Sequence, residues 1–171
     1  YLNIGVIGYG RLGKSFVKYV TPLAKRILVY EKFGKKISNN KKVTKVSLNY
    51  LLSNSDIISI HIHADKENIN FIDKNKLKKM KKNVLIINTS RGEVIHEKDL
   101  IEFVRKNKDS YYSTDVISSE INNKFKSPVL KEFKKNKRVL ITPHIAGMTK
   151  EAQEIAYTSI VENLINKISY R

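Results

Sequence analysis

The chain has 171 residues, of which 41% are hydrophobic, and a formal net charge of +17. That length suits one sizeable core in a single domain over 1–171, and the absence of cysteine excludes disulfides and thiolate metal sites. No apolar run approaches the roughly 20 residues that cross a bilayer, and no signal peptide is visible, so the sequence favours a soluble, cytoplasmic protein without a membrane partner.

The positive charge comes mostly from lysines spread along the chain among asparagines and isoleucines. Nucleic-acid surfaces usually concentrate arginine with stacking aromatic side chains, and no such cluster is present. The pattern therefore favours a solvated lysine surface over a specific nucleic-acid site, with weak attraction to polyanions.

Short apolar, β-branched runs alternate with helical patterns from one end of the chain to the other. In chain order, the runs predict strands at 2–8, 26–31, 42–46, 56–62, 83–89, 111–117 and 138–143. Helical patterns fall at 11–20, 47–52, 73–80, 97–106 and 149–168. Several runs are continuously apolar, as in parallel strands covered on both faces. The alternation predicts an α/β fold of the Rossmann type, a doubly wound and mainly parallel sheet with helices on both faces.

The helical patterns also predict which side chains are buried. One side of the third helix carries Leu77 and Met80. In the next two helices the expected core positions are Leu100, Ile101 and Val104, then Ile155, Ile160, Leu164 and Ile168.

A glycine-rich turn joins the first predicted strand to the first helix. In GYGRLG, Gly8 suits a tight turn, Gly10 allows the backbone to approach a pyrophosphate, and Gly13 allows close packing of helix on strand. The N–H groups of Arg11 and Leu12, at the start of that helix, can then face the phosphate charge. The motif alone is weak, but here it stands between a strand and a helix.

An acidic residue follows at the spacing that a dinucleotide site requires. Glu31 ends the second strand, 18 residues after Gly13, where a carboxylate can accept both hydroxyls of an adenosine ribose. A surface acid at a strand end is the plainer alternative. Because Lys32, Lys35 and Lys36 follow and could attract a 2′-phosphate, NADP stays open, although the carboxylate favours NAD.

Reactive side chains fall at the carboxyl ends of the last three strands, where ligands lie in such sheets. Arg91 follows one buried strand, Asp115 and Glu120 follow the next, and His144 follows the last. A guanidinium can hold a carboxylate and polarise a carbonyl, and an imidazole can give or take a proton. Taken singly, each could be a structural cation, a loop acid or a loop cap. Together they are the groups needed to interconvert 2-oxo and 2-hydroxy acids.

The segments that carry these residues resemble one enzyme family. GVIGYGRLG, INTSRGEVIHEKDL, TDVISSE and VLITPHIAG, in this order, resemble the coenzyme-binding domain of the D-isomer specific 2-hydroxyacid dehydrogenases, the phosphoglycerate dehydrogenase-like enzymes. The resemblance implies NAD as cofactor and hydride transfer to and from a small 2-oxo or 2-hydroxy acid. It implies that Arg91 binds the substrate carboxylate and carbonyl, that His144 is the acid and base, and that Glu120 pairs with His144.

The resemblance implies further contacts and a partner. Asp115 is expected at the nicotinamide end of the cofactor, and a homodimer is expected through this domain. The remaining residues expected along the cofactor, beyond those of the glycine turn, are Ile62, Thr89, Ser90, Arg91, His144 and Gly147.

The chain also departs from the family pattern. His63 stands where the family has a proline, and Ile121 replaces the usual proline after Glu120. His61 and His63 share one face of a strand, but two imidazoles without a nearby acid make a poor metal site.

The family's substrate domain is built mainly from residues preceding the coenzyme domain, and the sequence starts at Tyr1, directly before the first strand. We therefore expect a coenzyme domain with little turnover by itself. The alternative to an enzyme is an NAD-sensing interaction module like the dehydrogenase-related corepressors. Such a module needs the cofactor contacts but not the three catalytic side chains.

Overall fold

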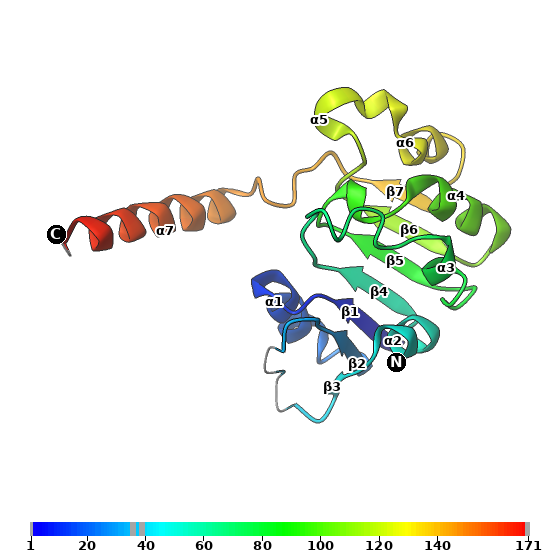
Figure 1. Cartoon of the computed structure of the whole chain (residues 1–171), viewed down its shortest axis with the longest axis horizontal. Coiled ribbons are helices and arrows are strands. Elements are labelled where there is room, and N and C mark those ends of the chain that lie inside the picture. Colours follow the sequence, from blue (N-terminus) through cyan, green and yellow to red (C-terminus); the bar gives the residue numbers. More distant parts are fainter. Residues whose placement is uncertain (1, 35–36, 38–39, 170–171) are drawn as a thin grey trace.

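The computed structural model describes residues 2–34, 37 and 40–169, which build one parallel sheet of seven strands in the order β3-β2-β1-β4-β5-β6-β7 (Figure 1). Every neighbouring pair of strands runs parallel. The strands are β1 (Leu2–Ile7), β2 (Ala24–Tyr30), β3 (Val43–Lys45), β4 (Ile57–Ile60), β5 (Leu85–Asn88), β6 (Tyr111–Thr114) and β7 (Val139–Ile141). The order reverses between β1 and β4, which is where doubly wound sheets open a crevice at their carboxyl edge.

Helices connect the strands, and all five predicted ones are present. The α-helices are α1 (Arg11–Val20), α2 (Leu48–Asn54), α3 (Lys74–Leu77), α4 (Glu97–Lys106), α5 (Glu120–Asn123), α6 (Pro128–Phe133) and α7 (Lys150–Ser169), with 3-10 turns η1 (Gly92–Val94) and η2 (Lys124–Lys126). α3 is shorter than predicted: it begins after its N-cap Asp73, whose side chain accepts from the N–H of Lys76, and it ends at Leu77. Met80 is nevertheless buried.

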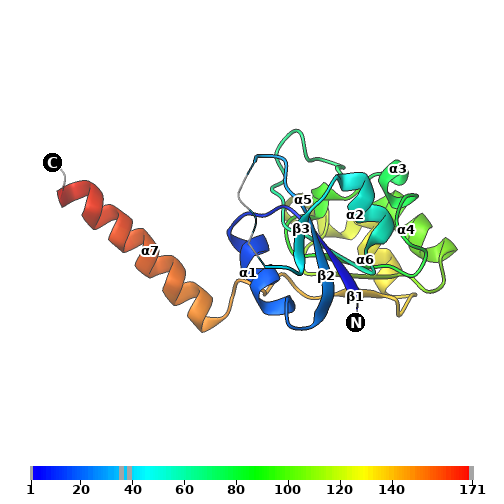
Figure 2. The same ribbon diagram turned by 90° about the horizontal axis from the view of Figure 1, so that it is seen from below.

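Two hydrophobic clusters hold the sheet between its layers. Because side chains alternate along a strand, β1 directs Ile4 and Val6 towards α1 and Ile7 towards the opposite face. The larger cluster lies on that opposite face under α2, α4 and α6, and Figure 2 shows α1 alone on its side of the sheet. The predicted α4 positions Leu100, Ile101 and Val104 all belong to the larger cluster. The doubly wound fold predicted from the sequence is confirmed.

The prediction was wrong for the apolar positions of the last helix. α7 extends away from the sheet (Figure 1), and Ile155, Ile160 and Leu164 are more than half exposed; the side chain of Ile168 lies outside the described residues. The apolar spacing is that of a packed helix, but in the described part of the chain α7 is not among the elements that pack extensively against another. Apolar periodicity identifies a helix face that is favourable to bury, but it does not identify the partner that buries it.

Among the described residues, no helix combines the length and apolarity needed to cross a membrane.

Candidate cofactor and active site

The glycine turn has the geometry that its sequence predicts. Gly8 has a φ of +93°, and a Cβ there would lie 2.6 Å from the carbonyl oxygen of His61. A Cβ on Gly13 would collide with the carbonyl oxygen of Gly8, so helix α1 packs directly on the turn. Gly10, by contrast, faces open space. It is the N-cap of α1 and offers no side-chain cap, so the first N–H groups of the helix, those of Arg11 and Leu12, can receive an anion.

Glu31 lies beside this turn and is buried to 7% exposure. One of its carboxylate oxygens accepts from the N–H of Tyr9 at 2.7 Å, and the other accepts from the N–H of Phe33 at 3.0 Å. Each oxygen of a carboxylate can accept two hydrogen bonds. These backbone donors therefore fix the orientation of the carboxylate and keep its charge at the edge of the turn.

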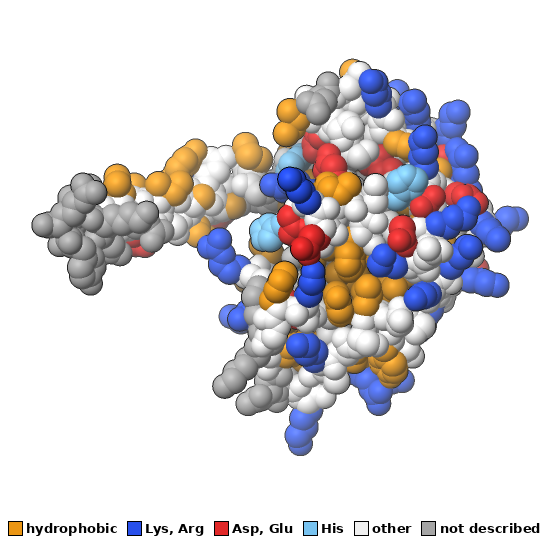
Figure 3. All heavy atoms as spheres, in the orientation of Figure 1, with side chains coloured by type: hydrophobic (Ala, Val, Ile, Leu, Met, Phe, Trp, Pro, Cys, Tyr) orange, Lys and Arg blue, Asp and Glu red, His pale blue; other side chains and the backbone are white. Residues whose placement is uncertain are grey.

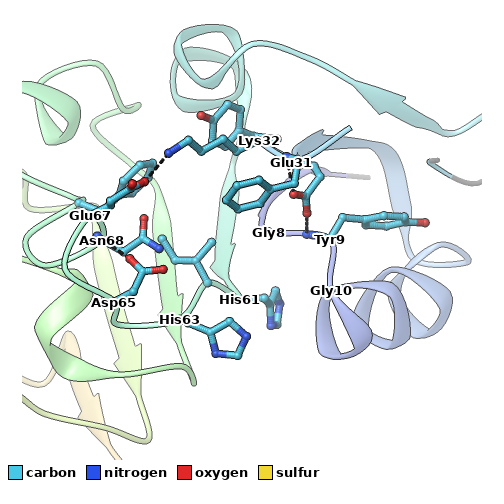
Figure 4. A pocket seen from close by; sticks show the side chains of 14 residues that line it. Gly8, Tyr9, Gly10, Glu31, Lys32, His61, His63, Asp65, Glu67 and Asn68 are labelled. Carbon is cyan, nitrogen blue, oxygen red and sulfur yellow. Dashed lines mark hydrogen bonds and ion pairs between the residues drawn. The ribbon is translucent and has the colours of Figure 1, made fainter. Parts of the chain in front are cut away.

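A pocket opens between the glycine turn and the segment that follows β4 (Figure 4). Four of the predicted cofactor residues line it: Gly8, Gly10, Glu31 and Ile62. Lys32 lines it as well, whereas Lys35 and Lys36, the other lysines of the NADP alternative, lie outside the described residues. The pocket is at the point where the strand order reverses, between β1 and β4.

The two histidines after β4 also line this pocket, in different environments. His61 donates to or accepts from Ser59 Oγ through Nε2 at 2.9 Å, and its ring lies 5.1 Å from that of Phe16. Burial lowers the pKa of His61 from 6.5 to about 4, so its ring is neutral near pH 7. His63 is exposed. Within the described residues, no group of three or more His, Cys, Asp or Glu could hold a metal.

The turn after β5 carries Arg91 and is organised by Asn88. The fully buried Asn88 amide donates to the carbonyl oxygen of Arg91 at 2.9 Å and accepts from both N–H and Oγ of Ser90. Thr89 and Arg91 are exposed, and the guanidinium donates to the carbonyl oxygen of Ser90 at 2.6 Å. Gly92 follows, and a Cβ there would collide with the backbone of the segment after β6. The turn with Arg91 therefore lies against the segment that leads to Glu120.

Asp115 ties the end of β6 to the loop after β7. Its carboxylate accepts from Thr142 Oγ1 at 2.5 Å and from the N–H groups of Ile145 and Ala146 at 3.1 and 2.9 Å. Burial opposes its ionisation, but these hydrogen bonds outweigh burial and hold the pKa of Asp115 below its usual value. Asp115 thus fixes the residues on both sides of His144. The expected contact of Asp115 with the nicotinamide stays a prediction.

His144 and Glu120 meet across this loop. His144 Nδ1 lies 3.0 Å from Glu120 Oε2, and both side chains are partly exposed, at 45% and 33%. His144 adopts a left-handed backbone conformation with a φ of +54°. Ser119, which precedes Glu120, has a φ of +57°, and Ile121 points into solvent with 99% exposure. Gly147 faces open space.

The positions after β5, β6 and β7 thus come together at one edge of the sheet, as predicted. An imidazole paired with a carboxylate there can exchange a proton, and an exposed guanidinium stands on the adjoining turn. A family model described as the NAD binding domain of D-isomer specific 2-hydroxyacid dehydrogenases matches residues 2–146. The chain belongs to this family.

Individual relatives agree with this assignment. The chain is 35% identical over 162 residues to hydroxypyruvate reductase of Blautia hydrogenotrophica, covering 95% of the chain and 49% of the relative. It is 34% identical over 163 residues to D-3-phosphoglycerate dehydrogenase of Archaeoglobus fulgidus, covering 95% of the chain and 30% of the relative. The structure of the NAD-dependent formate dehydrogenase of Staphylococcus aureus in complex with NAD aligns with a TM-score of 0.80 at 28% identity. The alignment covers 98% of this chain and 49% of that enzyme. The chain therefore spans half or less of these relatives, and it is an NAD-binding domain.

Sequence reasoning missed the residues that hold this family's site together. Besides Asn88, the buried Glu97 accepts from the N–H of Ser118 at 2.7 Å and from Ser127 Oγ at 2.6 Å. It thereby anchors both ends of the segment that carries Glu120. A polar residue at the end of an otherwise apolar strand was the available signal for Asn88. Nothing in the sequence distinguishes Glu97 from the other acids of α4.

Proposed function

We propose that this domain supplies the cofactor site and the proton-transfer group of a D-2-hydroxyacid dehydrogenase, which interconverts a 2-oxo acid and a D-2-hydroxy acid. When bound, NADH would supply the hydride that the carbonyl carbon of the oxo acid requires. The proton for the carbonyl oxygen comes from the imidazolium of His144. Arg91 holds the substrate carboxylate and polarises the carbonyl.

The observation that carries this proposal is the His144–Glu120 pair, 3.0 Å apart beside the Arg91 turn. A carboxylate on Nδ1 stabilises the protonated ring and leaves Nε2 to face the substrate. An NAD-sensing module needs no such pair, since cofactor contacts alone would serve it. The substrate itself stays general, a small 2-oxo or 2-hydroxy acid, because the relatives act on different ones by name.

The cofactor part of the proposal predicts that NADH binds more tightly than NADPH, because Glu31 accepts the ribose hydroxyls and repels a 2′-phosphate. Replacing Glu31 by alanine should weaken the binding of NADH by roughly 5- to 150-fold, the equivalent of about 1–3 kcal/mol for the loss of a hydrogen-bonding partner. It should also narrow the preference for NADH over NADPH. Fluorescence titration of the chain with both cofactors measures this.

Glu31→Gln is the matched variant, since it keeps an oxygen for the N–H of Tyr9 while removing the charge. Its preference for NADH should lie between those of the wild type and Glu31→Ala. Equal affinities for NADH and NADPH in the wild-type chain would contradict the role given to Glu31.

We also propose that the domain associates as a homodimer through α7. The helix exposes Tyr157, Ile160, Val161, Leu164 and Ile165, whose spacing forms one continuous face, and Figure 3 shows hydrophobic side chains along this projecting arm. Pairing two copies would remove both faces from water.

Sedimentation should therefore show a dimer for the wild-type chain and a monomer for Leu164→Lys. Glu162→Lys, which places the same charge on the opposite side of the helix, should remain dimeric. A wild-type chain that is monomeric up to high micromolar concentration would rule out this association.

A further inference from the structure

The described residues around the pocket between the glycine turn and the segment after β4 are mostly acidic where they are charged, although the chain as a whole is strongly basic. The lining contains three carboxylates, those of Glu31, Asp65 and Glu67, and a single ammonium, that of Lys32. The partly buried His61 adds no charge near pH 7, because desolvation lowers its pKa to about 4. A 2′-phosphate entering this pocket therefore meets more negative than positive charge, in spite of the net +17 of the chain.

Lys32, the one lysine or arginine among the described residues of the lining, is already engaged. Lys32 Nζ lies 2.5 Å from Glu67 Oε2, and the two residues come from opposite walls: Lys32 follows β2, and Glu67 lies in the turn after β4 (Figure 4). A hydrogen bond from the N–H of Asn68 to Asp65 Oδ1, 3.0 Å long, holds this turn in place. The hydrogen bond and charge of Glu67 raise the pKa of Lys32, and those of Lys32 lower the pKa of Glu67.

Among the described lining residues, Lys32 is the cation that could bind a 2′-phosphate, since it directly follows Glu31, the proposed ribose ligand. We propose that Glu67 is a specificity-determining residue, which holds the ammonium of Lys32 across the pocket and so withholds it from a 2′-phosphate. This inference rests on the proposed placement of the adenosine ribose beside Glu31. NAD requires nothing of Lys32 and binds with the pair intact. NADP would have to break the pair and leave Glu67 facing the phosphate.

The test is to replace Glu67 by glutamine and titrate the chain with NADH and NADPH at one low ionic strength. The substitution keeps the size of the side chain, removes one negative charge and frees Lys32. We expect the Kd of NADPH to fall roughly fivefold, the scale of one exposed ion pair, and the Kd of NADH to change less than twofold. An unchanged ratio of the two Kd values would overturn the inference.

Two further variants separate the release of Lys32 from the plain loss of a negative charge. In a Lys32→Gln background, Glu67→Gln should produce little of the gain, because the cation that the substitution frees is absent. If the full gain persists there, Glu67 acts by repulsion alone and the holding of Lys32 is refuted. The second variant, Glu102→Gln, breaks the similarly exposed pair of Lys74 and Glu102, which lies outside this pocket. It should leave both Kd values unchanged. A shift in the Kd of NADPH as large as that of Glu67→Gln would refute a local effect of Glu67.

The outcomes also distinguish this inference from the function on which it rests. If Glu31→Ala leaves the preference for NADH over NADPH intact, the ribose is not beside Glu31. The proposed placement of the cofactor and the role of Glu67 then fail together. If Glu31→Ala narrows the preference and Glu67→Gln does not, only the role of Glu67 fails.

Discussion

Replacing His144 by alanine in the complete protein should lower kcat for oxo-acid reduction by roughly 10²–10⁴-fold, the usual contribution of a positioned general acid. The Kd of NADH should stay nearly unchanged, because the pocket between β1 and β4 is lined by other residues. Steady-state kinetics give kcat, and fluorescence titration gives the Kd. A pH-dependent rate that survives this substitution would show that the acid is elsewhere.

The remaining candidates in that event are the histidines after β4, and the structure ranks them. The ring of His61 is hydrogen-bonded to Ser59 and has a pKa of about 4, so it is neutral near pH 7 and is not the imidazolium that a general acid requires. His63 is exposed at the pocket and would be the next residue to replace.

Glu120→Gln separates a positioning role from a structural one. Glutamine can still accept a hydrogen bond from His144 Nδ1, but it lacks the charge that stabilises the protonated ring. Proton transfer from His144 should therefore slow, and kcat for reduction should fall while KM for the oxo acid and the Kd of NADH stay nearly unchanged. A merely structural Glu120 would raise KM and the Kd of NADH together with the loss of kcat.

These kinetics also decide between the enzyme and the NAD-sensing alternative. A complete protein that binds NADH tightly, and yet reduces no small 2-oxo acid with His144, Glu120 and Arg91 intact, would favour the sensor. Turnover that His144→Ala abolishes and Glu120→Gln lowers through kcat would exclude the sensor.

The sequence alone predicts those parts of the fold and the site that leave a recognisable pattern along the chain. The turn at Gly8–Gly13 is marked by glycines at a fixed spacing between a strand and a helix, so its pattern predicts both its conformation and its position. Likewise, the carboxyl ends of parallel strands meet at one edge of a sheet. For that reason, the order of strands and helices in the sequence is enough to assign residues as far apart as Arg91 and His144 to one site.

The polar network that orients these residues could not be predicted in this way. Asp115 bonds to the N–H groups of Ile145 and Ala146, and Glu97 bonds to the N–H of Ser118. Both carboxylates satisfy backbone groups of distant loops, and no local periodicity encodes such contacts. The segment 118–133 was missed for the same reason: its helices α5 and α6 are only four and six residues long, too short to show a 3.6-residue pattern.

The second large effect is expected at Arg91. Replacing it by alanine in the complete protein should lower kcat/KM by roughly 10²–10⁴-fold, because two charge-assisted hydrogen bonds of about 1.5–3 kcal/mol each are lost. Both KM and kcat should suffer, since the same guanidinium holds the substrate carboxylate in the ground state and polarises the carbonyl in the transition state. This split differs from that of His144→Ala, in which kcat carries most of the loss.

Arg91→Lys tests whether the geometry of the guanidinium matters or only its charge. An ammonium is a point charge and cannot reproduce the planar fork that binds a carboxylate and a carbonyl together, so lysine should restore part of the affinity and little of kcat. The hydrogen bonds of the Asn88 amide to this turn go to the backbone of residue 91 and to Ser90, not to the side chain of Arg91, so the turn should keep its conformation in both variants. Arg105→Lys, at an exposed arginine paired with Glu132, is the control and should leave the kinetics unchanged. Full activity of Arg91→Lys would reduce the role of Arg91 to electrostatic attraction of an anionic substrate.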